Sequence, residues 1–179
     1  DAPESGQPHG KAAKAALSDL IYGKAVEVEP YEQDRYDRLV ARVWLDDLDV
    51  NAEMLRTGNA WTYRRYADDP AYCTYEHAAR DLGRGLWRLP ASQRVAPWEW
   101  RQRKSRAGRF TDYSRETVAA CVAAAAHGAP GTTVKPLQAW SGRLPLNVQP
   151  PLQSSLATHE DLARVWAQCR VHGAVPAID

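Results

Sequence analysis

Four residues at the start of the chain carry groups suited to binding a cation. Asp1 and Glu4 present carboxylates, and Pro3 between them fixes its own φ and biases Ala2 toward extended backbone. The two carboxylates are therefore held within a narrow range of relative positions. Hard divalent cations such as calcium prefer carboxylate and backbone carbonyl oxygens on a shaped turn. The motif thus favours an oxygen-ligated metal site.

A second charged cluster, Asp34-Arg35-Tyr36-Asp37-Arg38, stands immediately before an apolar run. The arginine guanidinium is planar and permanently charged, and its fork matches phosphate oxygens. A bound metal ion and forked arginines together suit chemistry on phosphate esters. The two clusters therefore predict a phosphate-directed site.

The order of these motifs resembles the staphylococcal nuclease (thermonuclease) family, and it fits the bacterial branch of that family. An order and spacing kept over about a hundred residues is more specific than any single motif. The resemblance implies an α+β fold with an OB-type barrel and packed helices. It rests on Asp1-Ala2-Pro3-Glu4, residues 10–17, 26–29, 34–38, 49–55, 58–61 and 63–66, and Gly85-Leu86-Trp87.

The resemblance also implies a role for each site residue. Asp1 and the carbonyl of Ala2 match metal ligands, with calcium as the cofactor. Glu4 matches the residue that assists the attacking water, and Arg38 matches the arginine that contacts the phosphate under attack. The matching substrate-binding positions are Arg35, Tyr36, Arg64 and Tyr66.

Among these positions, Arg35 and Tyr36 match contacts to a nucleotide phosphate, and Tyr66 matches a ring that stacks on a base. Stacking tolerates any sequence because every base has a π-face. Arg64 stands where the staphylococcal enzyme has another tyrosine. The resemblance therefore implies calcium-dependent hydrolysis of DNA and RNA by water, leaving 3′-phosphates.

The family pattern includes three strands ahead of the position of Asp1, with a further metal-binding aspartate and a catalytic arginine, whereas this chain opens at Asp1. We therefore expect a partial barrel lacking its N-terminal strands, and a poor nuclease. The strands left uncovered predict self-association, because open sheet edges pair with other chains. The alternative is a module that binds nucleic acid or protein without catalysis, as nuclease-like repeats do in Tudor-containing proteins.

Bulk composition constrains the partners less than the motifs do. The 179 residues carry a formal net charge of +1, so the overall field does not mark a nucleic-acid binder. A local basic run fits either a solvated tail or a nonspecific phosphate contact. No apolar stretch reaches membrane-spanning length, so no membrane partner is expected, and the resemblance favours a secreted or periplasmic location. The basic run is Arg101, Arg103, Lys104, Arg106 and Arg109.

The cysteines and histidines predict no metal cluster. Cys73, Cys121 and Cys169 are spaced too widely for a zinc ribbon, and the five histidines show no ligand spacing. One cysteine pair could form a disulfide and leave one thiol free. Alternatively, Cys121 and Cys169 could pack as small apolar side chains.

Two domains are expected. Residues 1–100 form the nuclease-like OB domain, and residues 101–179 hold the basic segment, a helix, a Pro/Gly-rich linker and a C-terminal helix of unknown role. In the first domain, periodicity predicts a helix over 9–20, strands over 24–29 and 38–45, a short helix over 49–57 and a longer one from 68 to about 82. Ala71, Tyr75, Ala78 and Leu82 share one face of the longer helix.

In the second domain, alanine-rich spacing predicts a helix over 114–126. Residues 128–156 read as a linker, within which alternation at 144–148 predicts a short strand. A capping-box-like pair, Thr158 and Asp161, opens a final helix that Gly173 would end.

Overall fold

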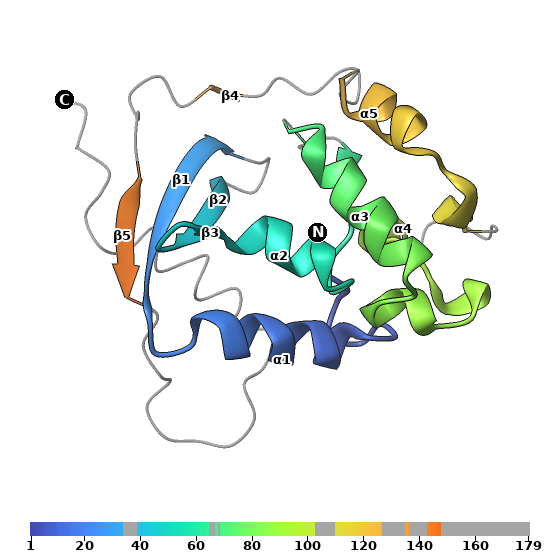
Figure 1. Ribbon diagram of the computed structural model, residues 1–179, viewed down its shortest axis with the longest axis horizontal. Coiled ribbons are helices and arrows are strands. Elements are labelled where there is room, and N and C mark those ends of the chain that lie inside the picture. Colours follow the sequence, from blue (N-terminus) through green and yellow to red (C-terminus); the bar gives the residue numbers. More distant parts are fainter. Residues whose placement is uncertain are drawn as a thin grey trace. The chain divides into compact units, whose positions relative to one another are not determined.

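The computed structural model describes residues 1–33, 39–64, 67, 69–102, 110–126, 135–136 and 143–147. The chain forms two compact units. One comprises Asp1–Leu20 and Asn51–Thr132, and the other comprises Ile21–Val50 and Thr133–Asp179. Helices dominate the first unit and strands the second, so the α+β class predicted from the sequence is confirmed (Figure 1).

Five α-helices occur in the described part of the chain. They are α1 (Gly10–Ile21), α2 (Val50–Arg56), α3 (Ala71–Asp81), α4 (Pro97–Gln102) and α5 (Val118–Ala126). Short 3-10 turns lie at Gly85–Arg88, Ala91–Gln93 and Tyr113–Arg115. None of these described helices has the length and apolar character needed to cross a membrane.

Two apolar clusters hold the first unit together. In one, Ala16, Leu17 and Leu20 of α1 pack against Met54 and Leu55 of α2. The other is aromatic: Trp61 meets Trp87 edge-on with ring centroids 4.5 Å apart. It is completed by Ala79, Leu86, Leu89, Ala96, Trp98 and Tyr113.

Two loops of the first unit meet backbone to backbone. Gly58 ends α2 with φ +72°, and its carbonyl accepts a hydrogen bond from the Leu86 N–H at 2.8 Å. A Cβ on Gly58 would lie 2.3 Å from the carbonyl oxygen of Arg84. A residue without a side chain is therefore required for this contact.

The second unit is built on an antiparallel sheet. Its strands are β1 (Ala25–Gln33), β2 (Leu39–Leu45), β3 (Leu48–Asp49), β4 (Lys135–Pro136) and β5 (Leu144–Asn147). They run in the order β3-β2-β1-β4, and β5 also pairs with β1. Glu27 pairs with Trp44 and Glu29 with Arg42, and the register shifts between Pro30 and Glu32. Alternation along β1 buries Val26 and Val28 and leaves Glu27 exposed.

The free edge of β1 is covered by the chain's own later residues. Val26 pairs with Leu146 and Val28 with Leu144, which confirms the strand predicted near residue 144. On its other side β2 pairs with β3, at Trp44 and Leu45. Self-association through uncovered strands stays a prediction.

The predicted order of elements over residues 9–87 is confirmed: helix, two strands, short helix, long helix. The buried face of α3, however, is not the one that carries Ala71, Tyr75, Ala78 and Leu82. Leu82 is 64% exposed, and the side chains that α3 buries are Tyr72, Cys73, Glu76 and Ala79. Apolar spacing misses this face because one of its members is a carboxylate.

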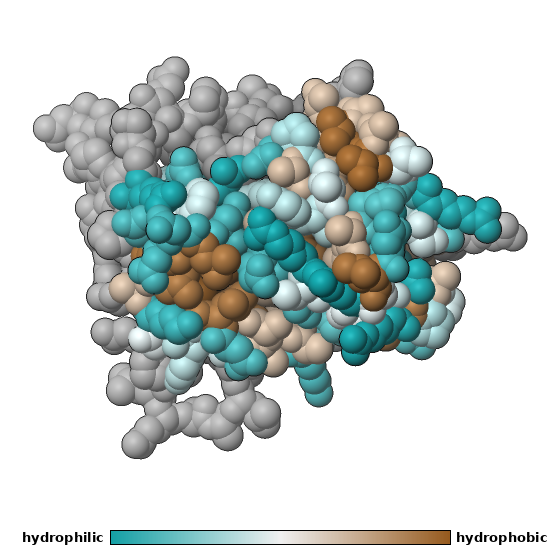
Figure 2. All heavy atoms as spheres, in the orientation of Figure 1, coloured by the Kyte–Doolittle hydropathy of each residue, from teal (hydrophilic) through white to brown (hydrophobic). Residues whose placement is uncertain are grey.

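The helix predicted over 114–126 is present as the 3-10 turn at Tyr113–Arg115 followed by α5. A disulfide joins Cys121 of α5 to Cys73 of α3, with the two Cα atoms 5.9 Å apart. In Figure 2 the surface where Figure 1 draws α5 is tan and brown, toward the apolar end of the hydropathy scale. The predicted C-terminal helix from Thr158 lies outside the described residues, and the division at residue 100 stays a prediction.

Replacing Cys73 and Cys121 by serine is expected to lower the free energy of unfolding by about 4 kcal/mol, because the disulfide closes a loop of 48 residues in the unfolded chain. Urea unfolding measures the loss. A reductant should destabilise the wild type and leave the double variant unaffected. Equal stability of Cys121→Ser and the matched control Cys169→Ser would show that the pairing is wrong.

Candidate active site

Asp1 is anchored to the core of the first unit through its backbone. Its nitrogen donates to the carbonyl of Trp61 at 2.7 Å, and the Trp61 N–H donates back to the Asp1 carbonyl at 2.9 Å. Trp61 is 1% exposed. A buried ring thus fixes the backbone that carries the first carboxylate.

A buried glutamine shapes the turn that carries Glu4. The Glu4 N–H donates to Gln7 Oε1 at 3.1 Å, and the Gln7 N–H donates to the Glu4 carbonyl at 2.8 Å. The Gln7 amide nitrogen also donates to the carbonyl of Val95. Gln7 is 6% exposed, and its bond to the Val95 carbonyl is buried. These hydrogen bonds fix the backbone of Glu4 within the first unit, which also contains Asp1.

The turn closes tightly against the start of α1. A Cβ on Gly10 would lie 1.9 Å from the carbonyl oxygen of Glu4, a separation that no side chain can tolerate. His9, just before it, has a φ of 69°, and its Nε2 lies 2.8 Å from Oδ1 of Asn59. The close contact with the first turn of α1 therefore fixes the position of the Glu4 backbone.

The two carboxylates converge on one cation of the chain. Arg101, in the last turn of α4, places Nη2 2.6 Å from Asp1 Oδ2 and Nη1 2.7 Å from Glu4 Oε1. Its Nη1 is also 3.2 Å from Asp1 Oδ1. Both acidic side chains are largely shielded, with 19% and 23% exposure.

The two carboxylates offer the type of oxygen ligand that a hard cation prefers, but they offer too few of them to fill its coordination sphere. The two carboxylates are close enough to share one positive group, and calcium takes carboxylate oxygens. Calcium takes about six to eight oxygens, more than two carboxylates supply. Among the described residues no group of three or more His, Cys, Asp or Glu could hold a metal ion. Carbonyl groups and water would have to complete any such site.

The structure does not bear on four of the predicted site residues. These residues, Arg35, Tyr36, Arg38 and Tyr66, lie outside the described part of the chain. Their roles in binding and catalysis therefore stay predictions. Of the predicted set, the structure brings the carboxylates of Asp1 and Glu4 to the same guanidinium.

Arg64 serves the interior rather than the surface. It is 8% exposed, and its guanidinium pairs with both oxygens of Glu76 at 2.9 Å and also with Glu116. It lies 5.7 Å from the ring centroid of Trp98. Such burial argues against the predicted role of Arg64 in substrate binding, because its guanidinium is already bound by carboxylates.

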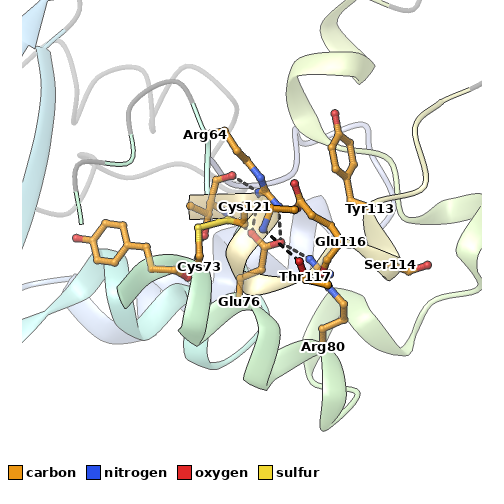
Figure 3. Close-up of polar contacts among 12 residues, drawn as sticks. Arg64, Cys73, Glu76, Arg80, Tyr113, Ser114, Glu116, Thr117 and Cys121 are labelled. Carbon is orange, nitrogen blue, oxygen red and sulfur yellow. Dashed lines mark hydrogen bonds and ion pairs between the residues drawn. A yellow bond between two sulfur atoms is a disulfide. The ribbon is translucent and has the colours of Figure 1, made fainter. Parts of the chain in front are cut away.

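Glu76 is the centre of this polar cluster. It is 1% exposed, and it accepts from Arg80 at 2.6 Å and from the Thr62 N–H at 2.6 Å, besides Arg64. Burial alone would raise the pKa of this carboxyl, but Arg64, the Thr62 N–H and Arg80 together hold the pKa below its ordinary value. Arg80 also donates to the carbonyl of Glu116, which ties the segment before α5 to α3 (Figure 3).

Sequence reasoning missed three residues that build the site: Gln7, Glu76 and Arg101. Glu76 is hidden because a charged residue in a helix reads as solvent-facing. Gln7 has no pattern of its own, although its place between Glu4 and Gly10 puts it inside the turn. In the sequence Arg101 stands out only as part of a basic run, and its separation of 100 residues from Asp1 conceals the contact.

Comparison with known proteins identifies the family of the chain. A family model described as "Staphylococcal nuclease homologue" matches residues 1–89. The chain is 42% identical over 104 residues to "Probable staphylococcal-like nuclease CAN1" of Oryza sativa subsp. japonica. It is 39% identical over 105 residues to an "Uncharacterized endonuclease" of Escherichia coli O157:H7, and 38% over 104 residues to one of Haemophilus influenzae. The chain belongs to the staphylococcal nuclease family.

The matched region is one part of each protein. It covers 58% of this chain in all three comparisons. It spans 31% of the rice relative, 67% of the Escherichia coli relative and 57% of the Haemophilus relative. The two bacterial relatives fit the predicted bacterial branch.

Gly10→Ala is expected to destabilise the protein by about 1–3 kcal/mol, because the new Cβ would overlap the Glu4 carbonyl. In an open helix the same change would be stabilising. Thermal unfolding measures the effect. Gly6→Ala is the matched control in the same turn, since its Cβ would meet nothing within 4 Å. A Gly10→Ala protein as stable as Gly6→Ala would contradict the close approach.

Glu76→Gln is expected to cost about 3–5 kcal/mol at pH 7, because it leaves Arg64 and Arg80 buried without their shared carboxylate. Because the folded pKa of Glu76 is depressed, its contribution is present above its unfolded pKa and is lost as pH falls through the folded value. Denaturant unfolding at a series of pH values from 7 down to 3 measures this contribution. The free energy of unfolding should fall less steeply with decreasing pH in the variant than in the wild type. Asp81→Asn, 65% exposed on the same helix, is the control and should change little.

Proposed function

We propose that the chain hydrolyses phosphodiester bonds of DNA and RNA with water as the nucleophile. The observation that carries the proposal is the convergence of Asp1 and Glu4, on a tightly built turn, around one positive group. Membership of the staphylococcal nuclease family supports the same chemistry. The activity of this chain is a proposal, because the matched region is only part of each nuclease relative.

In the proposed reaction Glu4 accepts the proton of the attacking water, whose oxygen bonds to phosphorus. The bond from phosphorus to the 5′-oxygen breaks, that oxygen takes a proton from solvent, and a 3′-phosphate remains. Arg38 would brace the charge that develops on the phosphoryl oxygens. Arg35, Tyr36 and Tyr66 would bind the neighbouring phosphate and base.

Calcium is the proposed cofactor, held by the Asp1 carboxylate and the Ala2 carbonyl. When bound, such a cation would offset negative charge on the phosphoryl group. Asp1 is suited to the task because its backbone is pinned to Trp61, so its carboxylate needs little ordering when an ion arrives.

The alternative function is binding of nucleic acid or protein without cleavage. The observation that favours it is the engagement of both carboxylates by Arg101, which neutralises the groups that catalysis needs. Cleavage distinguishes the two functions, because a binding module binds nucleic acid and leaves its length unchanged.

A secreted or periplasmic location is proposed as well. Disulfides persist in oxidising compartments, and Cys73 and Cys121 form one in this chain. Self-association through uncovered strands is also proposed; sedimentation of the purified chain measures it.

Digestion of DNA and RNA in calcium or in a calcium chelator tests the proposed activity. Slow, calcium-dependent cleavage is expected from the wild type. Glu4→Gln should reduce the rate by about 100-fold or more, as expected on loss of a general base. Glu27→Gln, an exposed carboxylate on β1, is the control and should cleave as the wild type does.

Each other outcome has a distinct meaning. Cleavage by Glu4→Gln at the wild-type rate would refute the role of Glu4. Retention of DNA in a gel shift without cleavage under any condition would favour the binding module. Products with 5′-phosphates would refute the proposed bond cleavage.

A further inference from the structure

Arg101 binds the Asp1 carboxylate, which the proposed calcium ion would also bind, together with the carboxylate of Glu4 beside it. Its guanidinium takes both oxygens of Asp1 at 2.6 and 3.2 Å and one oxygen of Glu4 at 2.7 Å. Arginine remains protonated in proteins, so this positive charge cannot be removed by a change in pH. A cation bound to the Asp1 carboxylate would lie close to this guanidinium, and the two positive charges would repel each other.

The helix that carries Arg101 is firmly held, whereas the end of its side chain is not. Pro97 and Ala96 at the start of α4 are buried, and the Ala96 carbonyl accepts from the N–H groups of Glu99 and Trp100. Trp98 packs into the aromatic cluster. The side chain of Arg101 is 41% exposed, so its guanidinium can leave the carboxylates while α4 stays in place.

The strength of the contact suits displacement. Ion pairs that are partly open to water contribute little to stability, because solvent screens them and the long side chain loses freedom. A divalent cation carries twice the charge of the guanidinium and can therefore displace it. The freed arginine would stand beside the cation with its fork turned to solvent, a geometry that suits a phosphate.

We propose that Arg101 competes with calcium for the carboxylate of Asp1, and that displacement by calcium makes Arg101 available to a phosphate of the nucleic acid. Arg101 thereby lowers the calcium affinity of the empty site and couples cation binding to substrate binding. This inference rests on the proposed function, since it takes the Asp1 carboxylate as a ligand of the cation.

Calorimetric titration of the full chain with calcium tests the competition. Calcium binds the site only in the fraction of molecules in which Arg101 has left it, so the apparent affinity is the intrinsic affinity multiplied by that fraction. Arg101→Gln should therefore bind calcium about threefold to tenfold more tightly than the wild type. Arg101→Lys should fall between the two, because a single ammonium cannot fork across both carboxylates.

Arg88→Gln is the matched control, because it removes the same charge from an exposed arginine that bonds only to the Gly83 carbonyl in the described contacts. It should bind calcium as the wild type does. Equal calcium affinity in Arg101→Gln and Arg88→Gln, with binding lost in Asp1→Asn, would overturn the competition and leave the cation site standing. No calcium binding in any variant, Arg101→Gln included, would overturn both.

Binding of a phosphorothioate-substituted single-stranded DNA, which resists cleavage, tests the coupling. Calcium should tighten binding to the wild type and to Arg88→Gln more than to Arg101→Gln, by about threefold. An Arg101→Gln defect of equal size with and without calcium would overturn the coupling, because it would mean that Arg101 meets phosphate without being displaced.

Discussion

The buried carboxylate of Glu76 links the interior of the first unit to the candidate site. It accepts the Thr62 N–H, and the neighbouring residue, Trp61, exchanges two backbone hydrogen bonds with Asp1. A buried charge is costly unless it is paired and hydrogen-bonded, so Arg64 and Arg80 must accompany it. Their shared partner Glu116 then draws the segment before α5 onto α3, where the disulfide secures it.

The candidate site follows from that anchored backbone and from one very tight turn. Gln7 satisfies the polar groups of the turn, and Gly10 allows the Glu4 carbonyl to approach α1. The turn brings two negative carboxylates close together, and like charges at such separation need a counter-charge. The guanidinium of Arg101 supplies this positive charge in the structure. In the proposed reaction a cation would supply it.

Local pattern was sufficient for most of the fold. Helical spacing predicted α1, α2, α3 and α5, and alternation predicted β1, β2 and β5, because each element repeats apolar residues at its own period. Pattern failed where a buried face contains a charge: the inward side of α3 holds Glu76, and its exposed side holds Leu82. Which cysteines pair was likewise open, since spacing says nothing about which thiols meet in space.

For the site, the order of motifs alone determined the family and singled out Asp1, Ala2 and Glu4 as a group, because these residues are neighbours in the chain and a proline limits their separation. Only the tertiary structure decided that Arg64 is an interior ion-pair partner and that Arg101 meets Asp1 and Glu4. Both arginines reach carboxylates far away in sequence. Such contacts depend on how helices pack, and no local spacing encodes them.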